Sequence, residues 1–555
     1  MPQSEVNTPA HLQDRKIKEN LDYAVCMKKI TWLHLLAAFI AAKILLHLYV
    51  NGLWSFHRDA LLYLSLGRHL DWGYASVPPL ISVWAWFATN VLGGSVQAVR
   101  LIPTIVGTGT VVLTALMAKE FLAGKKLNTE PGQPSGKFAA VLVGLAGLLS
   151  GAFLRPCMLF QPVVFDIFFW TLLCWLFLKY IQTEKSTWLV WFGVAVGFGL
   201  LNKYTVLFFL FAMLPGLLLT GLRHIFSEKK FYLATALALL VFSPNIYWQV
   251  VHEFPVLRHM GELAASQFTN VTVSGIFTDQ LRFHVPALPI WFFGLYFLLF
   301  HSRGKPYRIF GWMFLMVLAV LLFFNAKSYY SLGAYPVLIA AGAAFLERAT
   351  TDKMRWVRYA IPAFMLVIGL TTMPVSLPIY SPKKQAVFFQ KMTSKVPGLK
   401  GVLRWEDGNY YALPQDFADM IGWEELANAT GKTWQNLTDQ STAAIYAENY
   451  GQAGAIEHFG KKYGVEQVMS FSDNYRYWLP DSLPSNFKTL IYVNDELGDD
   501  MPGFFQQIEK VWELDMPLSR QHGDQVYLCH NPTPAFYERM NAAIWAAKNE
   551  KEIAD

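Results

Sequence analysis

The chain has 555 residues, of which 54% are hydrophobic and only 15% are charged. Soluble domains carry about 25% charged residues, so this composition excludes an ordinary soluble protein and indicates several membrane spans joined to polar segments. The net charge of +6 is not typical of nucleic-acid binding, because the basic residues occur in short clusters between apolar runs. The four cysteines are scattered, and their spacing does not predict a zinc site.

Apolar runs dominate the first two thirds of the chain. About 20 apolar residues cross a bilayer as a helix, and eleven runs are near that length. The first one follows about thirty polar residues, so we expect it to act as a signal anchor rather than a cleavable signal peptide. The predicted spans are 30–50, 99–122, 138–154, 163–181, 187–202, 204–220, 231–251, 285–301, 309–325, 331–347 and 359–378.

Every second connection between these runs is basic, including the segment before the first run, the loop with Lys125 and Lys126, and the loop with Lys229 and Lys230. Cytoplasmic loops are enriched in Lys and Arg. The pattern therefore predicts an odd number of spans, with the N-terminus in the cytoplasm and the C-terminus outside.

The remaining connections differ in character. Residues 51–98 form a long outer segment, in which 58–70 and 80–92 have the pattern of amphipathic helices lying at the membrane interface. Pro78 and Pro79 separate them, since the residue before a proline leaves the helical region. Residues 252–284 form a second outer segment.

After Pro378 the composition becomes mixed and polar, so residues 380–555 are predicted to form a separate soluble α+β domain outside the membrane. TLIYVN (489–494) and QVYLCH (525–530) are typical of strands, and AAIYAENYGQAGAIEHFGKKYG (443–464) is interpreted as helical. No internal repeat is visible in the sequence, which weakens a transporter interpretation, because many transporters are built from inverted halves.

Two acidic residues lie at the outer ends of apolar runs. Asp59 starts the segment 58–70, where an N-cap is the alternative role. Asp166 lies at the mouth of the fourth run, and an ionisable residue there is a functional hypothesis. On the predicted topology both face the same side, where one carboxylate could act as a base and the other could hold a cation or a sugar hydroxyl.

Basic residues share this predicted face, against the bias that places them inside. Each could simply extend its charged end to the interface. Together they predict a ring of positive charge suited to a lipid-linked phosphate or pyrophosphate. The ring comprises Lys203, Lys327, Arg282 and His284.

Motifs along the whole chain resemble those of one family. Its acidic residue after the first span is matched by Asp59 and is followed by further matches in order. These are Tyr63, Gly67-Arg68, Trp72-Gly73-Tyr74, Pro78-Pro79-Leu80, Arg100, FDIFFW (165–170), GLLNKYTVLFF (199–209), SPNIYWQVVHEFP (243–255), YYSLGAYPVLIAAGA (329–343), ENYGQAGAIEHFG (448–460) and SFSDNYRYW (470–478). The chain resembles bacterial GT-C glycosyltransferases of the dolichyl-phosphate-mannose-protein mannosyltransferase-like branch, with the lipid A aminoarabinose transferase as a more distant relative.

The resemblance implies a polytopic helical membrane domain of the GT-C type over 1–379 and a soluble domain over 380–555. It implies transfer of a sugar from a polyprenyl-phosphate donor to a lipid, glycan or protein acceptor at the outer face of a bacterial cytoplasmic membrane, with inversion. Asp59 would be the base and Asp166 would assist it. The expected donor- and substrate-binding residues are Lys203, Lys327, Arg282, His284, Arg58, Tyr63, Tyr329, Tyr330, His252 and Glu253.

One position departs from the family pattern. The family usually has an Asp-Glu pair after the first span, whereas this chain has Ala60 after Asp59. That puts in doubt any role of the second acid in orienting substrate or metal. It also leaves open that this protein is an inactive relative of the family. No metal site is assigned, and a divalent cation is left open. Two further functions stay open from the sequence, a transporter or flippase of a lipid-linked sugar and a ligase that moves a whole oligosaccharide.

Overall fold

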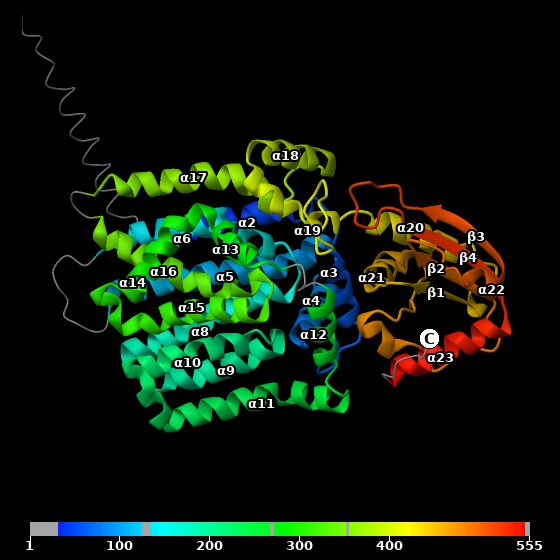
Figure 1. Ribbon diagram of the computed structural model, residues 1–555, viewed down its shortest axis with the longest axis horizontal. Helices are drawn as coiled ribbons and strands as arrows, with labels where there is room; N and C mark the ends of the chain where they lie inside the picture. The colour runs from blue at the N-terminus through cyan, green and yellow to red at the C-terminus, as the bar shows by residue number, and fades with distance from the viewer. Residues whose placement is uncertain (1–30, 125–133, 267–270, 351–353, 550–555) are drawn as a thin grey trace, which may run out of the picture.

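A computed structural model describes residues 31–124, 134–266, 271–350 and 354–549. Its helices form a long bundle, and a smaller unit with a β-sheet lies at one end of that bundle (Figure 1). Within the described residues, seven helices are long and apolar enough to cross a membrane, or up to ten if each of three bent pairs is one span. The count of eleven spans stays a prediction, and the basic segment before residue 31, Lys125 and Lys126 lie outside the described residues.

The bundle helices follow the predicted apolar runs within a few residues. The most enclosed of the candidate spans contains α16, and α2, α11 and α17 are the most exposed ones. The bundle consists of α2 (Trp32–Val50), α5 (Val96–Ala123), α6 (Lys137–Leu149), α7 (Gly151–Leu154), α8 (Pro162–Thr183), α9 (Thr187–Asn202), α10 (Val206–Leu219), α11 (Lys229–Val251), α14 (Leu288–Leu299), α15 (Arg308–Phe324), α16 (Tyr335–Ala349) and α17 (Val357–Ser376).

Small residues explain why α16 can lie at the centre. A Cβ atom added at Gly342 of α16 would come 1.8 Å from the Ile290 carbonyl oxygen of α14, and one at Gly294 would come 1.9 Å from the Leu338 carbonyl oxygen. The two helices therefore pack backbone against backbone, which only small residues permit.

The two outer segments are helical at the end of the bundle that faces the sheet. Residues 58–70 and 80–92 contain α3 (Arg58–Leu66) and α4 (Leu80–Asn90). Residues 252–284, for which the sequence predicted no element, contain α12 (Pro255–Ser266) and α13 (Val273–Phe283). Figure 1 shows α3, α4 and α12 between the bundle and the sheet.

The C-terminal unit has a four-stranded mixed sheet in the order β1-β2-β4-β3. β1 pairs parallel with β2, and β2 and β3 each pair antiparallel with β4. The strands are β1 (Ala443–Ala447), β2 (Thr489–Asn494), β3 (Phe505–Glu513) and β4 (Gln525–Pro532), and the helices are α18 (Pro382–Lys395), α19 (Gln415–Ala418), α20 (Trp423–Gln435), α21 (Tyr450–Phe459), α22 (Met501–Phe504) and α23 (Pro534–Lys548).

The helical interpretation of 443–464 is wrong for its first five residues. AAIYA forms β1, and the helix α21 begins only at Tyr450. Pairing with β2 buries Ile445 and Ala447, so tertiary packing decides the state of a short apolar run that propensity leaves ambiguous. Asn449 then caps α21 by accepting hydrogen bonds from the backbone N–H groups of Gly451 and Gln452.

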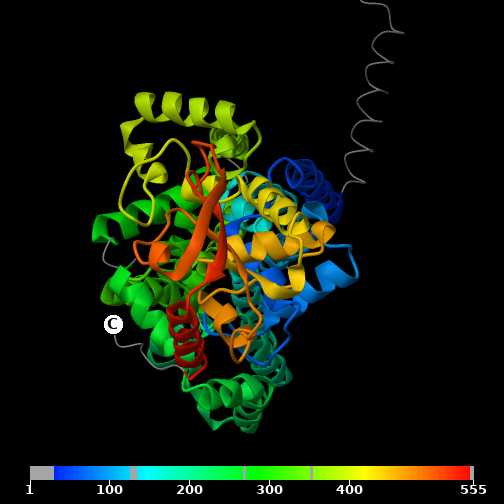
Figure 2. The same ribbon diagram turned by 90° about the vertical axis from the view of Figure 1, so that its right-hand side faces the viewer.

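The C-terminal unit shares a hydrophobic core with the outer helices. Phe56 and Leu61 from the first outer segment belong to the same buried cluster as Trp423 of α20 and Ile456 of α21. Viewed from the sheet end, the C-terminal strands and helices lie in front of the bundle (Figure 2). α3 therefore contacts both parts, and the boundary at residue 380 stays a prediction.

Candidate functional site

Asp59 lies in the first turn of α3, at the junction of the two parts. The N-cap of this helix is His57, whose side chain accepts a hydrogen bond from the Asp59 backbone N–H, so capping is not the role of the Asp59 carboxylate. That carboxylate instead accepts hydrogen bonds from Gln161 Nε2 at 2.8 Å and from the Tyr450 hydroxyl at 2.9 Å. The side chain remains 31% exposed, so a substrate can reach it.

The surroundings of Asp59 favour its charged form. Burial by itself would raise the pKa of this carboxyl, but His57, Arg58 and the hydrogen bonds from Tyr450 and Gln161 outweigh it, and the pKa falls below the ordinary value of 3.8. Its position in the first helical turn adds to this, since the helix dipole favours a negative charge there. Asp59 is therefore a carboxylate at neutral pH, as a general base must be.

Asp166 is linked to Asp59 through the start of α8. Gln161, the Asp59 partner, is the N-cap residue of α8, and Asp166 lies five residues further on. At 1.5 Å per residue, Gln161 and Asp166 are about 7.5 Å apart along the helix axis. Asp166 is buried and accepts a hydrogen bond from the Thr205 hydroxyl at 2.7 Å. The two acids therefore lie at the same end of α8, each with its own partners.

Lys203 lies beside Asp166 in the break between α9 and α10, close enough for the two charges to interact. Its Nζ atom is 5.0 Å from the ring centre of Tyr329 and 4.8 Å from that of Tyr330. Tyr329 in turn interacts electrostatically with Tyr63 and Asp59. The two tyrosines thus connect the basic side of the site to the acidic one, with Lys203 held over their faces.

Lys327 forms an ion pair that crosses between the two parts of the protein. Its Nζ atom lies 2.8 Å from Glu406 Oε1, and Glu406 Oε2 accepts a hydrogen bond from Gln415. Burial would raise the pKa of Glu406, but Lys327 and these hydrogen bonds lower it. The C-terminal part therefore neutralises one of the cations predicted for the donor phosphate.

The other predicted site residues have different surroundings. Arg282 pairs with Asp279 at 3.1 Å and donates to the Gly398 carbonyl at 2.7 Å. His284 is buried between the rings of Phe153 and Tyr335. His252 stacks on Trp248 at 4.0 Å, and Glu253 is exposed at the end of α11. Arg282, His284 and His252 therefore have other partners, and Glu253 is exposed. The residues that the structure brings together are Arg58, Asp59, Tyr63, Asp166, Lys203, Lys327, Tyr329 and Tyr330.

Sequence reasoning missed the residues that hold Asp59. Gln161 precedes an apolar run, and Tyr450 lies in the C-terminal part, where the only signal was the motif ENYGQAG. His57 was also missed, although its Nε2 atom lies 3.7 Å from Asp419 Oδ2 and 3.9 Å from Asp416 Oδ1. Among the described residues, no group of three or more His, Cys, Asp or Glu side chains has the arrangement to hold a metal ion.

A cavity of about 160 Å³ opens next to this site. Tyr450 forms part of its wall, opposite α12. The remaining lining residues are Ala75, Pro255, Arg258, His259, Glu262, Ser472, Asp473 and Arg476. It therefore lies between α12 and the C-terminal unit, directly beside the Asp59 partner.

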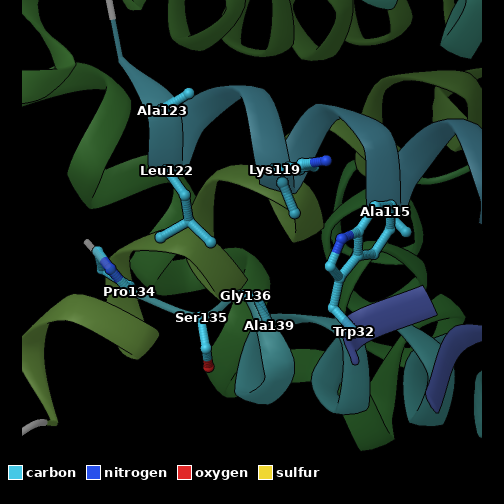
Figure 3. A pocket seen from close by; sticks show the side chains of 11 residues that line it. Trp32, Ala115, Lys119, Leu122, Ala123, Pro134, Ser135, Gly136 and Ala139 are labelled. Carbon is cyan, nitrogen blue, oxygen red and sulfur yellow. The ribbon is translucent and has the colours of Figure 1, made fainter. Parts of the chain in front are cut away.

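A second cavity, of about 100 Å³, lies far from these residues. It is lined by the last turns of α5, by Trp32 and by Ser135, with Lys119 beside the Trp32 ring (Figure 3). Arg100, near the start of α5, binds the backbone of Asn51 and Trp54 close to Asp59. About 20 residues of α5 separate the two ends, roughly 30 Å, so this cavity is not part of the site.

Known proteins resemble this chain in sequence and in fold. The family model described as dolichyl-phosphate-mannose-protein mannosyltransferase matches residues 76–248. The lipid A galacturonosyltransferase RgtD of Rhizobium johnstonii is 27% identical over 213 residues, a match that spans 38% of this chain and 42% of that protein. Crystal structures of ArnT from Cupriavidus metallidurans, in the apo state and bound to undecaprenyl phosphate, match with a TM-score of 0.56 at 14% identity, over 90% of this chain and 97% of theirs.

The fold is that of the GT-C glycosyltransferases, a class of multi-pass membrane proteins. The chain is similar in fold to ArnT, and its residues 76–248 match the mannosyltransferase family model, which confirms the resemblance predicted from its motifs.

Proposed function

We propose that this protein is a membrane glycosyltransferase that moves a sugar from a polyprenyl-phosphate donor to an acceptor hydroxyl, with inversion. The reaction takes place at the outer face of a bacterial cytoplasmic membrane, with the N-terminus in the cytoplasm and the C-terminal unit outside. The observation that carries the proposal is the position of the Asp59 carboxylate in a GT-C fold. Gln161 and Tyr450 hold it at the end of the bundle where Lys203 lies over Tyr329 and Tyr330.

The chemistry needs one base and one stabilised leaving group. Asp59 takes the proton of the acceptor hydroxyl while that oxygen forms a bond to the anomeric carbon. The bond between the anomeric carbon and the phosphate oxygen breaks, and its electron pair leaves with the polyprenyl phosphate. Because this leaving group is already an anion, it needs a nearby cation more than a proton, and Lys203 supplies that charge.

The donor fits the arrangement of the two parts. A polyprenyl chain is apolar and can lie between exposed bundle helices, while its phosphate stays at the end where Lys203 and Lys327 lie. The related ArnT structure contains undecaprenyl phosphate, which supports a lipid phosphate as the donor carrier. Lys327, now paired with Glu406, would exchange that carboxylate for the phosphate when the donor binds.

The acceptor class of this enzyme is a lipid, glycan or protein hydroxyl. A flippase would need polar side chains near the middle of the bundle. Here the charged side chains lie at one end, and they are Asp59, Asp166, Lys203 and Lys327. That distribution favours chemistry at one membrane face over transport.

The test is donor turnover by purified protein in nanodiscs, offered polyprenyl-phosphate sugars and an envelope extract. General base catalysis contributes about 10²–10⁴-fold, so Asp59→Asn should lose that factor in kcat while it still unfolds cooperatively on heating. Asp481→Asn is the control, since Asp481 is 99% exposed and pairs only with Lys548 among the described contacts. Equal turnover by parent and Asp59→Asn would remove Asp59 as the base, and a parent that binds donor without turnover would favour transport.

A further inference from the structure

Tyr450 lies between the cavity beside α12 and the Asp59 carboxylate. It forms part of the cavity wall, and its hydroxyl donates to Asp59 Oδ1 at 2.9 Å. Arg58 lies over the Tyr450 ring, with its Cζ atom 4.4 Å from the ring centre. Tyr450 is the first residue of α21, which begins with a capping box of Asn449 and Gln452.

Each oxygen atom of Asp59 accepts one hydrogen bond from a neighbouring side chain. Gln161 donates to Oδ2 and Tyr450 donates to Oδ1. A carboxylate oxygen can accept two hydrogen bonds, so an acceptor hydroxyl can bind Asp59 beside these donors or in the place of one of them. Gln161 is the N-cap residue of α8, whereas Tyr450 borders open space. Tyr450 is therefore the donor that can leave.

The cavity in front of Tyr450 is lined by both donors and acceptors. α12 supplies Arg258, His259 and Glu262, and the facing segment supplies Asp473 and Arg476. Mixed donors and acceptors match sugar hydroxyls, each of which donates one hydrogen bond and accepts others. Such a lining suits neither an apolar tail nor a phosphate alone.

We propose that this cavity binds the hydroxyl-rich sugar part of the acceptor, and that Tyr450 is a positioning residue which the acceptor hydroxyl replaces at Asp59 Oδ1. The proposal rests on the proposed glycosyltransferase function. Before the acceptor binds, the Tyr450 hydroxyl holds Asp59 Oδ1 by its hydrogen bond. When the acceptor enters, its hydroxyl takes over the hydrogen bond to Oδ1, and Asp59 then removes its proton.

The test is Tyr450→Phe, which removes the hydroxyl and keeps the ring under Arg58. The acceptor KM should fall several-fold because the competing hydrogen bond is gone, and donor hydrolysis without acceptor should rise several-fold because water can take the place of the Tyr450 hydroxyl at Oδ1. The acid limb of the pH profile of kcat/KM should move to higher pH. The Tyr450 hydrogen bond lowers the pKa of Asp59, and the variant lacks that bond. Tyr446→Phe is the matched control, as it removes a phenol that donates to Glu448 at 3.2 Å in the same unit.

A purely structural role for Tyr450 would lower the thermal stability and leave the acid limb and the acceptor KM unchanged, and that result would overturn the proposal. If Tyr450→Phe does not fold, Arg258→Ala and Glu262→Ala on the exposed face of α12 replace it. They should raise the acceptor KM several-fold and leave the donor KM unchanged. If the parent is active and these variants keep its acceptor KM, only the cavity proposal is overturned. If the parent shows no turnover, the glycosyltransferase function is overturned and this inference with it.

Discussion

Burial of Asp524 predicts that the C-terminal unit loses stability as the pH rises. Asp524 is 3% exposed, and its carboxylate accepts one hydrogen bond, at 2.8 Å, from Gln452. Burial raises the pKa of Asp524 to about 7, from an ordinary value of 3.8. Between these two values the folded state holds a proton that the unfolded state has released. Stability therefore falls from about pH 4 to pH 7, by up to about 4 kcal/mol at 1.36 kcal/mol per pH unit.

Asp524→Asn should remove this dependence, because an amide cannot ionise and still offers an oxygen to Gln452. Thermal unfolding of the purified protein between pH 4.5 and 8.5 should show the variant gaining stability over the parent as the pH rises, with little difference at pH 4.5. Asp439→Asn is the control, since hydrogen bonds with Ser441 lower the pKa of that exposed carboxyl and no gain is expected. Parallel curves for parent and Asp524→Asn would refute the reasoning.

Two further predictions concern the site and its support. Lys203→Met should reduce kcat about 10²–10³-fold, the usual effect of losing one group that stabilises developing negative charge, and unchanged turnover in the nanodisc assay would remove Lys203 from the reaction. Gly73→Ala should destabilise the protein by about 1–3 kcal/mol, because its Cβ would come 2.4 Å from Trp248 Cε3. The measurement is thermal unfolding beside Gly261→Ala, where a Cβ meets nothing within 4 Å, and equal stability of both variants would contradict this packing argument.

The helices of the bundle could be predicted from the sequence because membrane spans are long and continuously apolar. Runs such as 99–122 and 163–181 became α5 and α8 almost unchanged. A five-residue apolar run carries far less information. AAIYA was interpreted as helical, and it forms a strand because β2 offers it a partner 46 residues away in register, Ala443 opposite Thr489.

The partners of the site residues could not be predicted in the same way. The position of Asp59 followed from its place after the first span, but its hydrogen bond to Tyr450 joins residues 391 positions apart. Arg282 and His284 are two residues apart and both basic, yet one binds Asp279 on the surface of a helix and the other lies among aromatic rings. Sequence places a charge near a membrane face, and only the packing of other elements decides what that charge contacts.

The position of Asp59 between the bundle and the C-terminal unit has a physical reason. Inside the apolar bundle an unpaired carboxylate would be costly, and in open water its attraction to distant cations would be weak. At this junction the bundle supplies Gln161, Lys203 and the apolar surface that a polyprenyl chain needs, while the C-terminal unit supplies Tyr450 and the Glu406 partner of Lys327. A change that loosens the contact between the two parts should therefore alter the base and the phosphate-binding cation together.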